Sequence, residues 1–335
     1  MARLLTNGAK RQTVVITGAS AGVGRALALR FARGGGRVGL IARDLRSLAA
    51  VAEEVTSLGG RAAIAAADVA DANAVFAAAQ SIARKLGPID IWINNAMATV
   101  FSSVAEISPA EFRRVTEVTY LGSVHGTMAA LRHMRARGSG TIVQVGSSLS
   151  YRGIPLQSAY CGAKYAIRGF LDSLRAELIH DGSGIRLTMV QLPAVNTPQF
   201  DWARTHRSRQ PRPVPPVVQP EAVADAIFRA AHGSRREYWV GLGTAKVIVG
   251  SLLLPSLLDR YLARNAYEAQ DRPAVAAPDR PDNLEQPVHA LHRTHGSFDR
   301  EAGRSAALLS GAGVRIVLAT VGIIVLLLIP TLLFA

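Results

Sequence analysis

A tyrosine and a lysine, four residues apart in the segment YCGAK, are the side chains of this chain best suited to acid–base chemistry. On a helix this spacing puts Tyr160 and Lys164 on one face. The pKa of tyrosine is normally about 10, and a neighbouring ammonium favours the phenolate, so Lys164 would lower it. Tyr160 could then exchange a proton with the alkoxide that forms when a ketone accepts hydride. Upstream, after an apolar run, the hydroxyl of Ser147 or of Ser148 could hold the same oxygen atom.

A glycine-rich turn near the N-terminus could bind phosphate. The segment VVITGASAGVGRALA places Gly18, Gly22 and Gly24 between an apolar run and an Ala-rich stretch. Glycine allows a tight turn and a close backbone approach, and the N-terminus of a following helix offers free N–H groups and a positive dipole end. The strand–turn–helix context predicts that this turn holds the phosphates of a dinucleotide.

Short apolar runs alternate with helical stretches from residue 13 onward. The runs expected to be buried strands are 14–17, 37–42, 89–94, 141–146, 185–190 and 237–240, and residues 222–231 indicate a helix. Buried strands separated by helices predict right-handed β–α–β units on a parallel sheet. We therefore expect an α/β fold with a doubly wound parallel sheet, formed by a single catalytic domain over residues 12–245.

Several motifs follow one another in an order that resembles the short-chain dehydrogenase/reductase family: the TGxxxGxG turn, the pair Asp68-Val69, the NNA of residues 94–96 and YxxxK. The resemblance covers about residues 12–245. It implies a Rossmann-type fold and an NAD(P)-dependent oxidoreductase that interconverts a carbonyl and an alcohol, and of the two serines it favours Ser147. The implied catalytic residues are Ser147, Tyr160, Lys164 and Thr119, and the implied cofactor-binding residues are Gly18, Ser20, Gly22, Val23, Gly24, Arg43, Asp68, Val69, Asn95, Ala96, Tyr160, Lys164, Val195 and Thr197.

The chain departs from the family's pattern at three places. Thr119 stands where the family carries the asparagine that completes a proton relay through the lysine and a water molecule. Its hydroxyl could still bind a water or shape the helix, so an altered relay is expected rather than a lost one. Met97 replaces the glycine of the NNAG motif. Ala194 follows Pro193 where the family has glycine, which could narrow the pocket.

The end of the second predicted strand indicates which cofactor is used. NAD-preferring members of the family carry an acid there, which binds the ribose hydroxyls and repels a 2′-phosphate. This chain has Ala42 followed by Arg43, whose guanidinium suits a phosphate. Against this, Ala21 lacks the basic side chain that many NADP-using relatives place before the second glycine, and Asp44 is close. We expect NADP(H) to be favoured over NAD(H).

Composition limits the classes of function. The 335 residues carry 38 Lys plus Arg against 24 Asp plus Glu, a net charge of +14, which permits binding to nucleic acid, to an anionic membrane or to acidic ligands. No helix-turn-helix, zinc or RNA-recognition signature is present, so nucleic acid is not an expected partner. A single cysteine, Cys161, excludes a disulfide scaffold and multi-cysteine zinc modules. His125, His133 and His180 lack the spacing of metal ligands, so no metal site is expected.

The C-terminal quarter has a different character from the domain and from the N-terminal tail (1–11). Residues 246–264 are apolar but interrupted by glycine and proline, and they suit an interfacial helix or a pocket wall. Residues 265–313 are polar, and we interpret them as a linker that is partly folded back. Ile316–Ala335 is a run of twenty uncharged residues, which at about 1.5 Å per residue matches a hydrocarbon core of about 30 Å. Residues 314–335 are therefore predicted to be a single-pass transmembrane anchor.

The predicted anchor bears on orientation and substrate. It would leave the catalytic domain facing the cytoplasm, and three basic residues before the span agree with positive-inside orientation; they are Arg300, Arg304 and Arg315. In the family's substrate loop, here 199–220, Phe200 and Trp202 could line an apolar pocket. The arginines of this loop could meet an anionic surface or an acidic substrate; they are Arg204, Arg207, Arg209 and Arg212. A tether raises encounter with bilayer-dissolved compounds, so we expect a small hydrophobic carbonyl or alcohol as substrate.

Two further expectations concern partners and function class. The resemblance suggests a homodimer or homotetramer formed through the long helices that bear Thr119 and Tyr160. A second class of function stays open, a non-catalytic nucleotide-binding or scaffold protein at a membrane. The departures at Thr119, at Met97 and at Ala194, where the family has glycine, are those of an altered active site.

Overall fold

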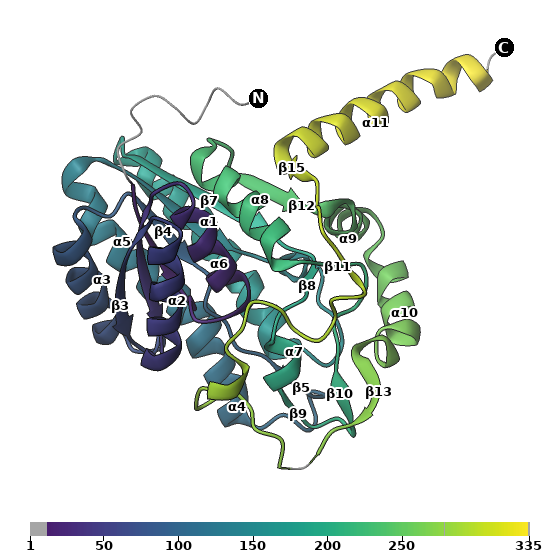
Figure 1. Ribbon diagram of the computed structural model, residues 1–335. Helices are drawn as coiled ribbons and strands as arrows, with labels where there is room; N and C mark the ends of the chain where they lie inside the picture. The colour runs from purple at the N-terminus through teal and green to yellow at the C-terminus, as the bar shows by residue number, and fades with distance from the viewer. Residues whose placement is uncertain (1–11, 278, 334–335) are drawn as a thin grey trace.

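Seven parallel strands form the central sheet in the order β3-β2-β1-β4-β6-β7-β12, and β15 extends one edge as an antiparallel strand (Figure 1). A computed structural model describes residues 12–277 and 279–333, without the side chains of residue 322 and of residues 324–333. The predicted N-terminal tail, 1–11, lies outside the described residues. The sheet strands are β1 (Thr13–Thr17), β2 (Arg37–Ala42), β3 (Arg61–Ala66), β4 (Ile91–Asn94), β6 (Ser139–Val145), β7 (Gly184–Gln191), β12 (Glu237–Val240) and β15 (Leu308–Ser310).

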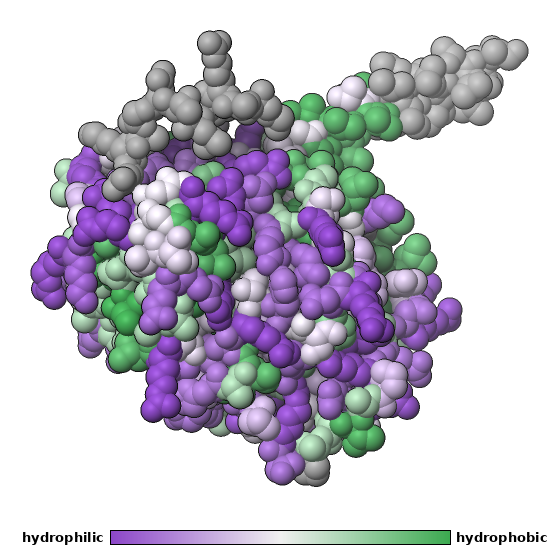
Figure 2. Space-filling model, in the orientation of Figure 1, coloured by the Kyte–Doolittle hydropathy of each residue, from purple (hydrophilic) through white to green (hydrophobic). Residues whose placement is uncertain are grey.

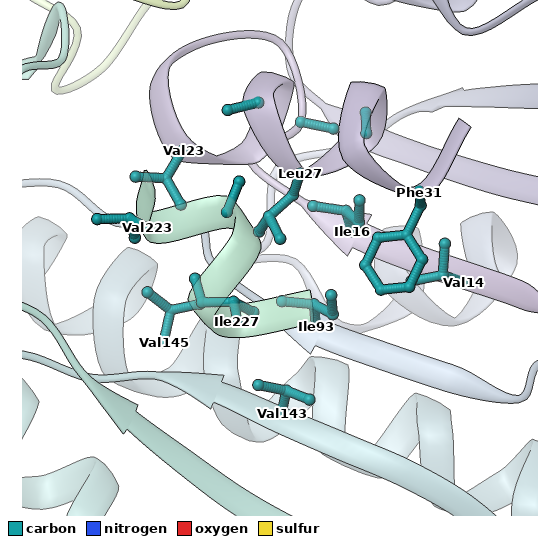
Figure 3. Close-up of a cluster of buried hydrophobic side chains, with 14 of the residues drawn as sticks. Val14, Ile16, Val23, Leu27, Phe31, Ile93, Val143, Val145, Val223 and Ile227 are labelled. Atoms are coloured by element: carbon teal, nitrogen blue, oxygen red, sulfur yellow. The ribbon is translucent and has the colours of Figure 1, made fainter. Parts of the chain in front are cut away.

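Helices cover both faces of this sheet. On one face lie α1 (Gly22–Ala32), α2 (Leu45–Ser57) and α8 (Pro220–His232), and on the other lie α3 (Ala72–Leu86), α5 (Gly122–Met134) and α6 (Ser158–His180). Figure 3 shows the first interface, where Val14 and Ile16 of β1 pack against Leu27 and Phe31 of α1. Strands that are apolar on both faces can be buried only in this way. The prediction of an α/β fold with a doubly wound parallel sheet is confirmed.

The strand order reverses between β1 and β4, because β1 continues to β2 on one side and β4 pairs with it on the other. In doubly wound sheets, ligands bind outside the carboxyl ends of the strands at such a switch point. The glycine-rich turn follows β1 directly, so the fold places it there.

Smaller elements surround that edge of the sheet. Short strand pairs or triplets are β5 (Val100–Phe101) with β9 (Arg204–Thr205), β10 (Arg209–Pro211) with β13 (Asp271–Val275), and β8 (Ala194–Val195) with β11 (Val217–Val218) and β14 (Ala302–Gly303). The further helices are α4 (Pro109–Thr116), α7 (Gln199–Trp202), α9 (Gly241–Leu253), α10 (Pro255–Asn265) and α11 (Gly311–Leu333), and a π-helical turn (Glu117–Leu121) joins α4 to α5. Single turns of 3₁₀-helix occur at 135–137, 148–150, 268–270 and 289–291.

The polar segment 265–313, interpreted above as a linker, packs along the catalytic domain. Leu284 and Phe298 are only 1% and 5% exposed, and β13, β14 and β15 pair with strands of the domain. The segment is held mainly by backbone hydrogen bonds and ion pairs rather than by a periodic apolar stripe. Its sequence therefore resembles that of a linker, because a buried segment can be recognised from sequence only when its apolar residues recur at a regular spacing.

Three of the four arginines in the 199–220 loop form ion pairs within the molecule, whereas Arg209 is exposed. Arg204 pairs with Glu111 and Asp282, and Arg207 pairs with Asp271. Arg212 pairs likewise with Glu301, an acid of the C-terminal segment. These three arginines therefore hold the C-terminal segment that the sequence suggested was a linker.

The apolar segment 246–264 forms the end of α9 and the whole of α10, with the break at Leu254–Pro255. Ile248 is buried, but most of the leucines face outward; Leu253, for example, is 66% exposed. Helix α11 follows β15 and projects away from the rest of the molecule (Figure 1). Among the residues that the structure describes, no helix is both long and apolar enough to cross a membrane, so the structure does not support the predicted anchor. The end of that anchor, residues 334–335, lies outside the described residues.

Candidate active site

Glycine is required at the turn after β1. Gly18 and Gly22 have positive φ angles of 67° and 54°, a conformation that side chains disfavour. A Cβ on Gly18 would lie 2.9 Å from the Cα of Ala96, and one on Gly24 would collide with the carbonyl oxygen of Gly18. The three glycines therefore let the turn fold against the end of β4 and against the first turn of α1.

Hydrogen bonds hold the ends of β1 and β4 together. The side-chain amide of Asn95 donates to the carbonyl oxygens of Thr17 and Gly18 at 3.0 and 3.3 Å. The backbone N–H groups of Asn95 and Ala96 donate to the Thr17 hydroxyl at 3.0 and 3.1 Å. Asn95 thus positions the glycine-rich turn, which fixes the N-terminus of α1 where phosphate could bind.

A cavity of about 180 Å³ lies in front of this turn. Most of the predicted cofactor-binding residues line it: Gly18, Ser20, Gly22, Val23, Arg43, Asp68, Val69, Asn95, Ala96 and Thr197. Gly24 instead packs beneath the turn, and Val195, Tyr160 and Lys164 line a second cavity. We call the first the cofactor cavity.

Residues 282–293, which we call the strap, cross the cofactor cavity from the C-terminal segment. The guanidinium of Arg43 donates to the backbone carbonyls of Leu284 and Glu285 at 3.2 and 2.8 Å, and to that of Asn283. Burial lowers the pKa of Arg43, which nevertheless keeps its charge at neutral pH. Arg43 thus lines the same cavity as the glycine-rich turn, and it also holds the strap.

Asp68 and Asp44 supply negative charge to the same cavity. Asp68 forms an ion pair with Arg114, which also contacts the strap. Burial would raise the pKa of Asp44, but hydrogen bonds from Ser47, from His289 and from a backbone N–H lower it to about 2. Asp44 is therefore ionised at neutral pH.

The second cavity, of about 430 Å³, contains the tyrosine, the lysine and both candidate serines, and we call it the substrate cavity. Its walls are mostly apolar; they include Phe101, Leu149, Ile154, Leu192, Phe200, Val214, Val247 and Leu262. Five residues line both cavities and mark where they meet: Val23, Asn95, Met97, Thr197 and Gln199. A ligand that extends from the glycine-rich turn past Thr197 would reach Tyr160.

Tyr160 and Lys164 lie on one face of α6, as predicted. The Lys164 ammonium donates to the carbonyl oxygen of Val145 at 2.7 Å, and its Nζ lies 5.5 Å from the centre of the Tyr160 ring. Burial lowers the pKa of Lys164 to about 8. Burial also raises the pKa of Tyr160 above its usual value, and the Ser147 hydroxyl offsets part of this rise.

The expected lowering of the Tyr160 pKa by Lys164 is therefore not what the structure gives. Removal of the phenol from water raises its pKa, and the Lys164 ammonium donates to the end of β6 instead of to the phenol oxygen. Tyr160 is a neutral phenol at neutral pH, a form that can donate a proton. Both candidate serines line the cavity, but it is the Ser147 hydroxyl that forms the hydrogen bond with Tyr160 and lowers its pKa.

Comparison with known proteins agrees with this geometry. A family model described as short chain dehydrogenase matches residues 12–208. The chain belongs to the short-chain dehydrogenase/reductase family. The prediction that it is an NAD(P)-dependent oxidoreductase of this family is confirmed.

Three similar proteins show the range of the matches. The uncharacterized oxidoreductase YxnA of Bacillus subtilis is 32% identical over 269 residues, which are 79% of this chain and 76% of that protein. The fatty acyl-CoA reductase of Acinetobacter baylyi is 31% identical over 229 residues, 68% of this chain and 75% of that protein. An alcohol dehydrogenase from the archaeon Thermococcus sibiricus, solved in complex with 5-hydroxy-NADP, is 26% identical with a TM-score of 0.60, and the match covers 69% of this chain and 96% of that one.

Thr119 occupies the position of the relay asparagine in this short-chain dehydrogenase, but it does not line either cavity. Its hydroxyl donates to the carbonyl oxygen of Ala98 and accepts from the Ala98 N–H, both at 3.0 Å. The hydroxyl of Ser123 donates to the Thr119 carbonyl at 2.9 Å. The side chain of Thr119 therefore ties the π-helical turn to the loop after β4, and the structure does not bring it to the reacting groups.

Other sequence candidates lie apart from the reacting groups. Cys161 is buried beside Tyr160, and burial raises the pKa of its thiol to about 11, so the thiolate is scarce at neutral pH. Among the described residues, no three or more His, Cys, Asp or Glu side chains gather in a way that could hold a metal ion. Of the two aromatics predicted to line the substrate pocket, Phe200 lines the substrate cavity and Trp202 lines the cofactor cavity.

Sequence reasoning missed several residues of both cavities. Phe101 and Gln157 line the substrate cavity, and Leu284 and His292 of the strap line the cofactor cavity. No local signal marks them, because the strap is about 240 residues from Arg43 and an isolated apolar residue has no characteristic spacing.

Proposed function

We propose that this protein is an NADP-dependent oxidoreductase that interconverts a carbonyl and an alcohol on a hydrophobic, lipid-like small molecule. The observation that carries the proposal is the junction of the two cavities. Tyr160 and Ser147 face a large apolar space, and Thr197 links that space to the turn at the N-terminus of α1. The cavity that would hold the cofactor thus opens into the cavity that holds the proton donor.

The side chains present suit the reduction of a carbonyl. A bound nicotinamide cofactor supplies the hydride. The Ser147 hydroxyl holds the carbonyl oxygen, and neutral Tyr160 donates a proton to this oxygen as its negative charge develops. The ammonium of Lys164 stabilises the phenolate that remains on Tyr160. In the opposite direction the same phenolate would accept the proton of an alcohol.

The residues around the cofactor cavity fit a dinucleotide. Gly18 and Gly22 leave no Cβ between the turn and the cavity. The N–H groups that follow Gly22 in the first turn of α1 suit a pyrophosphate. We assign Ser20 and Val23 to the phosphates, Asp68, Val69, Asn95 and Ala96 to the adenosine side, and Val195 and Thr197 to the nicotinamide. The preference for NADP over NAD rests on Arg43 and has the support of the similar dehydrogenase solved with 5-hydroxy-NADP.

The walls of the substrate cavity support the proposed substrate class. Phe101, Phe200 and Leu262 offer apolar contact over its length, and about 25 cal/mol are gained per Å² of apolar surface buried. A similar protein is a fatty acyl-CoA reductase, which supports a substrate with a long apolar part.

The test is a series of straight-chain ketones and aldehydes of increasing length, mixed with NADPH and followed by absorbance at 340 nm and by mass spectrometry of the alcohol. We expect kcat/KM to rise steeply with chain length until the cavity is filled. Equal turnover of acetone-sized and long substrates would contradict the substrate class. Loss of NADPH signal without any alcohol would contradict the reaction.

We further propose that the protein is a membrane protein, anchored once by the C-terminal helix with the catalytic domain facing the cytoplasm. The support is the uncharged run Ile316–Ala335 and the apolar surface next to it. Figure 2 shows apolar residues around the base of α11 and on the α9–α10 flank, and the exposed leucines of that flank are Leu242, Leu252, Leu253, Leu254 and Leu257. Val247 and Leu262 of the same two helices line the substrate cavity, so a substrate dissolved in the bilayer would have a short path.

A charge in the run tests the anchor. An arginine at the centre of a membrane span costs about 2.5–3.5 kcal/mol, so Leu326→Arg should shift the protein from the membrane fraction toward the soluble fraction, whereas Leu326→Val should not. The measurement is flotation of the full chain with vesicles. Equal flotation of both variants would contradict anchoring by this segment.

We also propose that the protein forms a homodimer or homotetramer. Met128 of α5 and Tyr165 of α6 are large and exposed, and these are the helices through which family resemblance suggests dimers or tetramers. Met128→Glu should then reduce the mass of the assembly in solution, measured by light scattering. An unchanged mass, or a monomeric wild-type protein, would contradict this interface.

A further inference from the structure

The strap is a wall of the cofactor cavity that lies beyond the part of the chain matched by the family model, residues 12–208. It is fixed at one end by Arg43 and by Arg114, whose Nε donates to the carbonyl oxygen of Leu284 at 3.1 Å. At its other end the N–H of Gly22 donates to the carbonyl oxygen of Arg293 at 3.0 Å. The strap thus joins the end of β2 to the glycine-rich turn.

These contacts place His292 beside Ala21 and Gly22. Arg25 of α1 donates to the carbonyl oxygen of His292 at 2.7 Å, and the imidazole lies against Trp202 with 5.3 Å between ring centres. The ring lines the cofactor cavity together with Ala21 and Arg43. Its side chain is only 10% exposed.

Both ring nitrogens of His292 lack a hydrogen-bond partner among the described residues. The Asp44 carboxylate lies 3.6 Å from Nε2, which is beyond hydrogen-bond distance. A buried polar group without a partner costs free energy, so such a group at a cavity wall suits a ligand that supplies the missing bond. The orphaned imidazole therefore points to a polar ligand group beside Ala21 and Arg43.

Ala21 and Arg43 define which ligand group that is. Arg43 was assigned to a 2′-phosphate from the sequence, and Ala21 lacks the second basic side chain that a 2′-phosphate commonly meets. We propose that His292, delivered by the strap, binds the 2′-phosphate of NADP(H) together with Arg43 and so sets the preference for NADP(H) over NAD(H). This inference rests on the proposed nucleotide function of the cavity.

Arg43 can hold the strap and a phosphate at once. A guanidinium has five N–H donors, and the three hydrogen bonds to strap carbonyls leave two. The ionised Asp44 would repel a 2′-phosphate if Arg43 were the only cation present. A protonated His292 next to Asp44 would offset that repulsion, whereas the ribose hydroxyl of NAD(H) gains little from either charge.

The charges around His292 predict a proton effect. Burial lowers the pKa of His292, the Asp44 carboxylate raises it, and the neighbouring basic groups lower it further. The charged and titratable groups that face the ring are Asp44 after β2, Arg43 of the same loop, Arg25 of α1 and His289 of the strap. The imidazole is thus neutral at neutral pH before a ligand binds. A dianionic phosphate would raise its pKa, so NADPH binding should take up a proton there.

The first experiment measures dissociation constants of NADPH and NADH by nicotinamide fluorescence, with the full chain. His292→Ala and His292→Gln should each weaken NADPH binding about tenfold and leave NADH binding within about twofold, because one charge-assisted hydrogen bond is lost. The matched control is His295→Ala, since His295 bonds to Glu221 at 2.8 Å and does not line the cavity. It should change neither constant by more than about twofold.

The second experiment measures proton uptake on binding by calorimetry in buffers of different ionisation enthalpy. The wild-type protein should take up more protons with NADPH than His292→Ala does, and the two should not differ with NADH. Titration of the phosphate itself is common to both proteins and cancels in this comparison.

The outcomes separate the inference from the proposed function. Equal weakening of NADPH and NADH, unchanged binding of both, or the same loss in His295→Ala would overturn the role of His292 while the cofactor assignment stands. A wild-type protein that binds neither nucleotide, or that prefers NADH, would overturn the cofactor assignment and this inference with it.

Discussion

The cofactor cavity and the substrate cavity meet at Thr197 but are built in different ways. The cofactor cavity is fixed by hydrogen bonds between strand ends, such as those of Asn95 to Thr17 and Gly18, and by ion pairs such as Asp68 with Arg114. The substrate cavity is enclosed by apolar side chains from segments between Phe101 and Leu262. Directional bonds demand particular residue types at particular spacings, whereas apolar walls accept many residues of suitable volume. The first cavity therefore leaves motifs in the sequence and the second leaves almost none.

The C-terminal quarter of the chain covers both cavities, one by polar contacts and the other by apolar contacts. The strap covers the cofactor cavity through carbonyl and carboxylate contacts, such as His289 with Asp44 at 2.9 Å. Helices α9 and α10 cover the substrate cavity through Val247 and Leu262. Changes on one side should therefore leave the function of the other side intact, and the predictions for Tyr160→Phe and Val247→Trp test this separation.

The largest effect is expected for Tyr160→Phe. Loss of the proton donor should lower kcat for ketone reduction by about 10²–10⁴-fold, while the dissociation constant of NADPH stays within about twofold. The control is Tyr165→Phe, on the same helix but exposed to solvent, which should retain the wild-type rate. Stopped-flow absorbance at 340 nm gives the rate, and a fast Tyr160→Phe enzyme would refute the role of Tyr160.

The pH profile of reduction should depend on Lys164. Burial lowers the pKa of Lys164 to about 8, so its ammonium is present below that pH and is lost above it. The rate of ketone reduction at saturating NADPH should be level up to pH 8 and then fall about tenfold per pH unit, since the phenolate loses its stabilising charge. A rate that keeps rising through pH 9 would show that the ammonium is not needed.

Filling the substrate cavity should change the rate by no more than the pH effect at Lys164 does. Val247→Trp should lower kcat/KM for long-chain ketones by about tenfold and leave short ketones nearly unchanged, because only the long chains reach this wall. The matched variant is Leu253→Trp, at an exposed position of the same helix. If NADPH binding weakens as much as long-chain turnover does, the two cavities are not separate in the way described.

The smallest effect on the rate is expected for Thr119→Val. The substitution leaves the buried N–H and carbonyl of Ala98 without their partner, so it should reduce the free energy of unfolding by about 1–3 kcal/mol. The rate of reduction should fall by less than about threefold, because the hydroxyl does not line either cavity. Thermal unfolding and steady-state rates measure both; a large loss of kcat with normal stability would place Thr119 in a proton relay after all.

The sequence was sufficient to predict the parallel sheet, the glycine-rich turn and the pair Tyr160 and Lys164. Each of these depends on local periodicity or on spacing within one element and its neighbour. The direction of the Tyr160 pKa was not predictable, because it depends on burial by residues from distant segments. The role of Thr119 was not predictable from its position in the motif. The Thr119 hydroxyl donates to the carbonyl oxygen of Ala98 and accepts from the N–H of the same residue, and the sequence does not reveal this contact.

The C-terminal segment was the least predictable region. Its acids pair with Arg204, Arg207 and Arg212, and these contacts join residues far apart in the chain. Ion pairs between distant segments produce no periodic pattern, so polar residues that hold a wall in place resemble those of a solvated linker. The net positive charge consequently says less about partners than its size suggests.

The most direct test of the account is the transfer of label from cofactor to product. NADPH deuterated at both C4 positions is mixed with a long-chain ketone, and the alcohol is analysed by mass spectrometry. We predict that each alcohol formed by the wild-type enzyme carries one deuterium on the carbinol carbon, and that Tyr160→Phe forms almost none of it. Alcohol without deuterium, or equal labelled product from Tyr160→Phe, would contradict hydride transfer with proton donation by Tyr160.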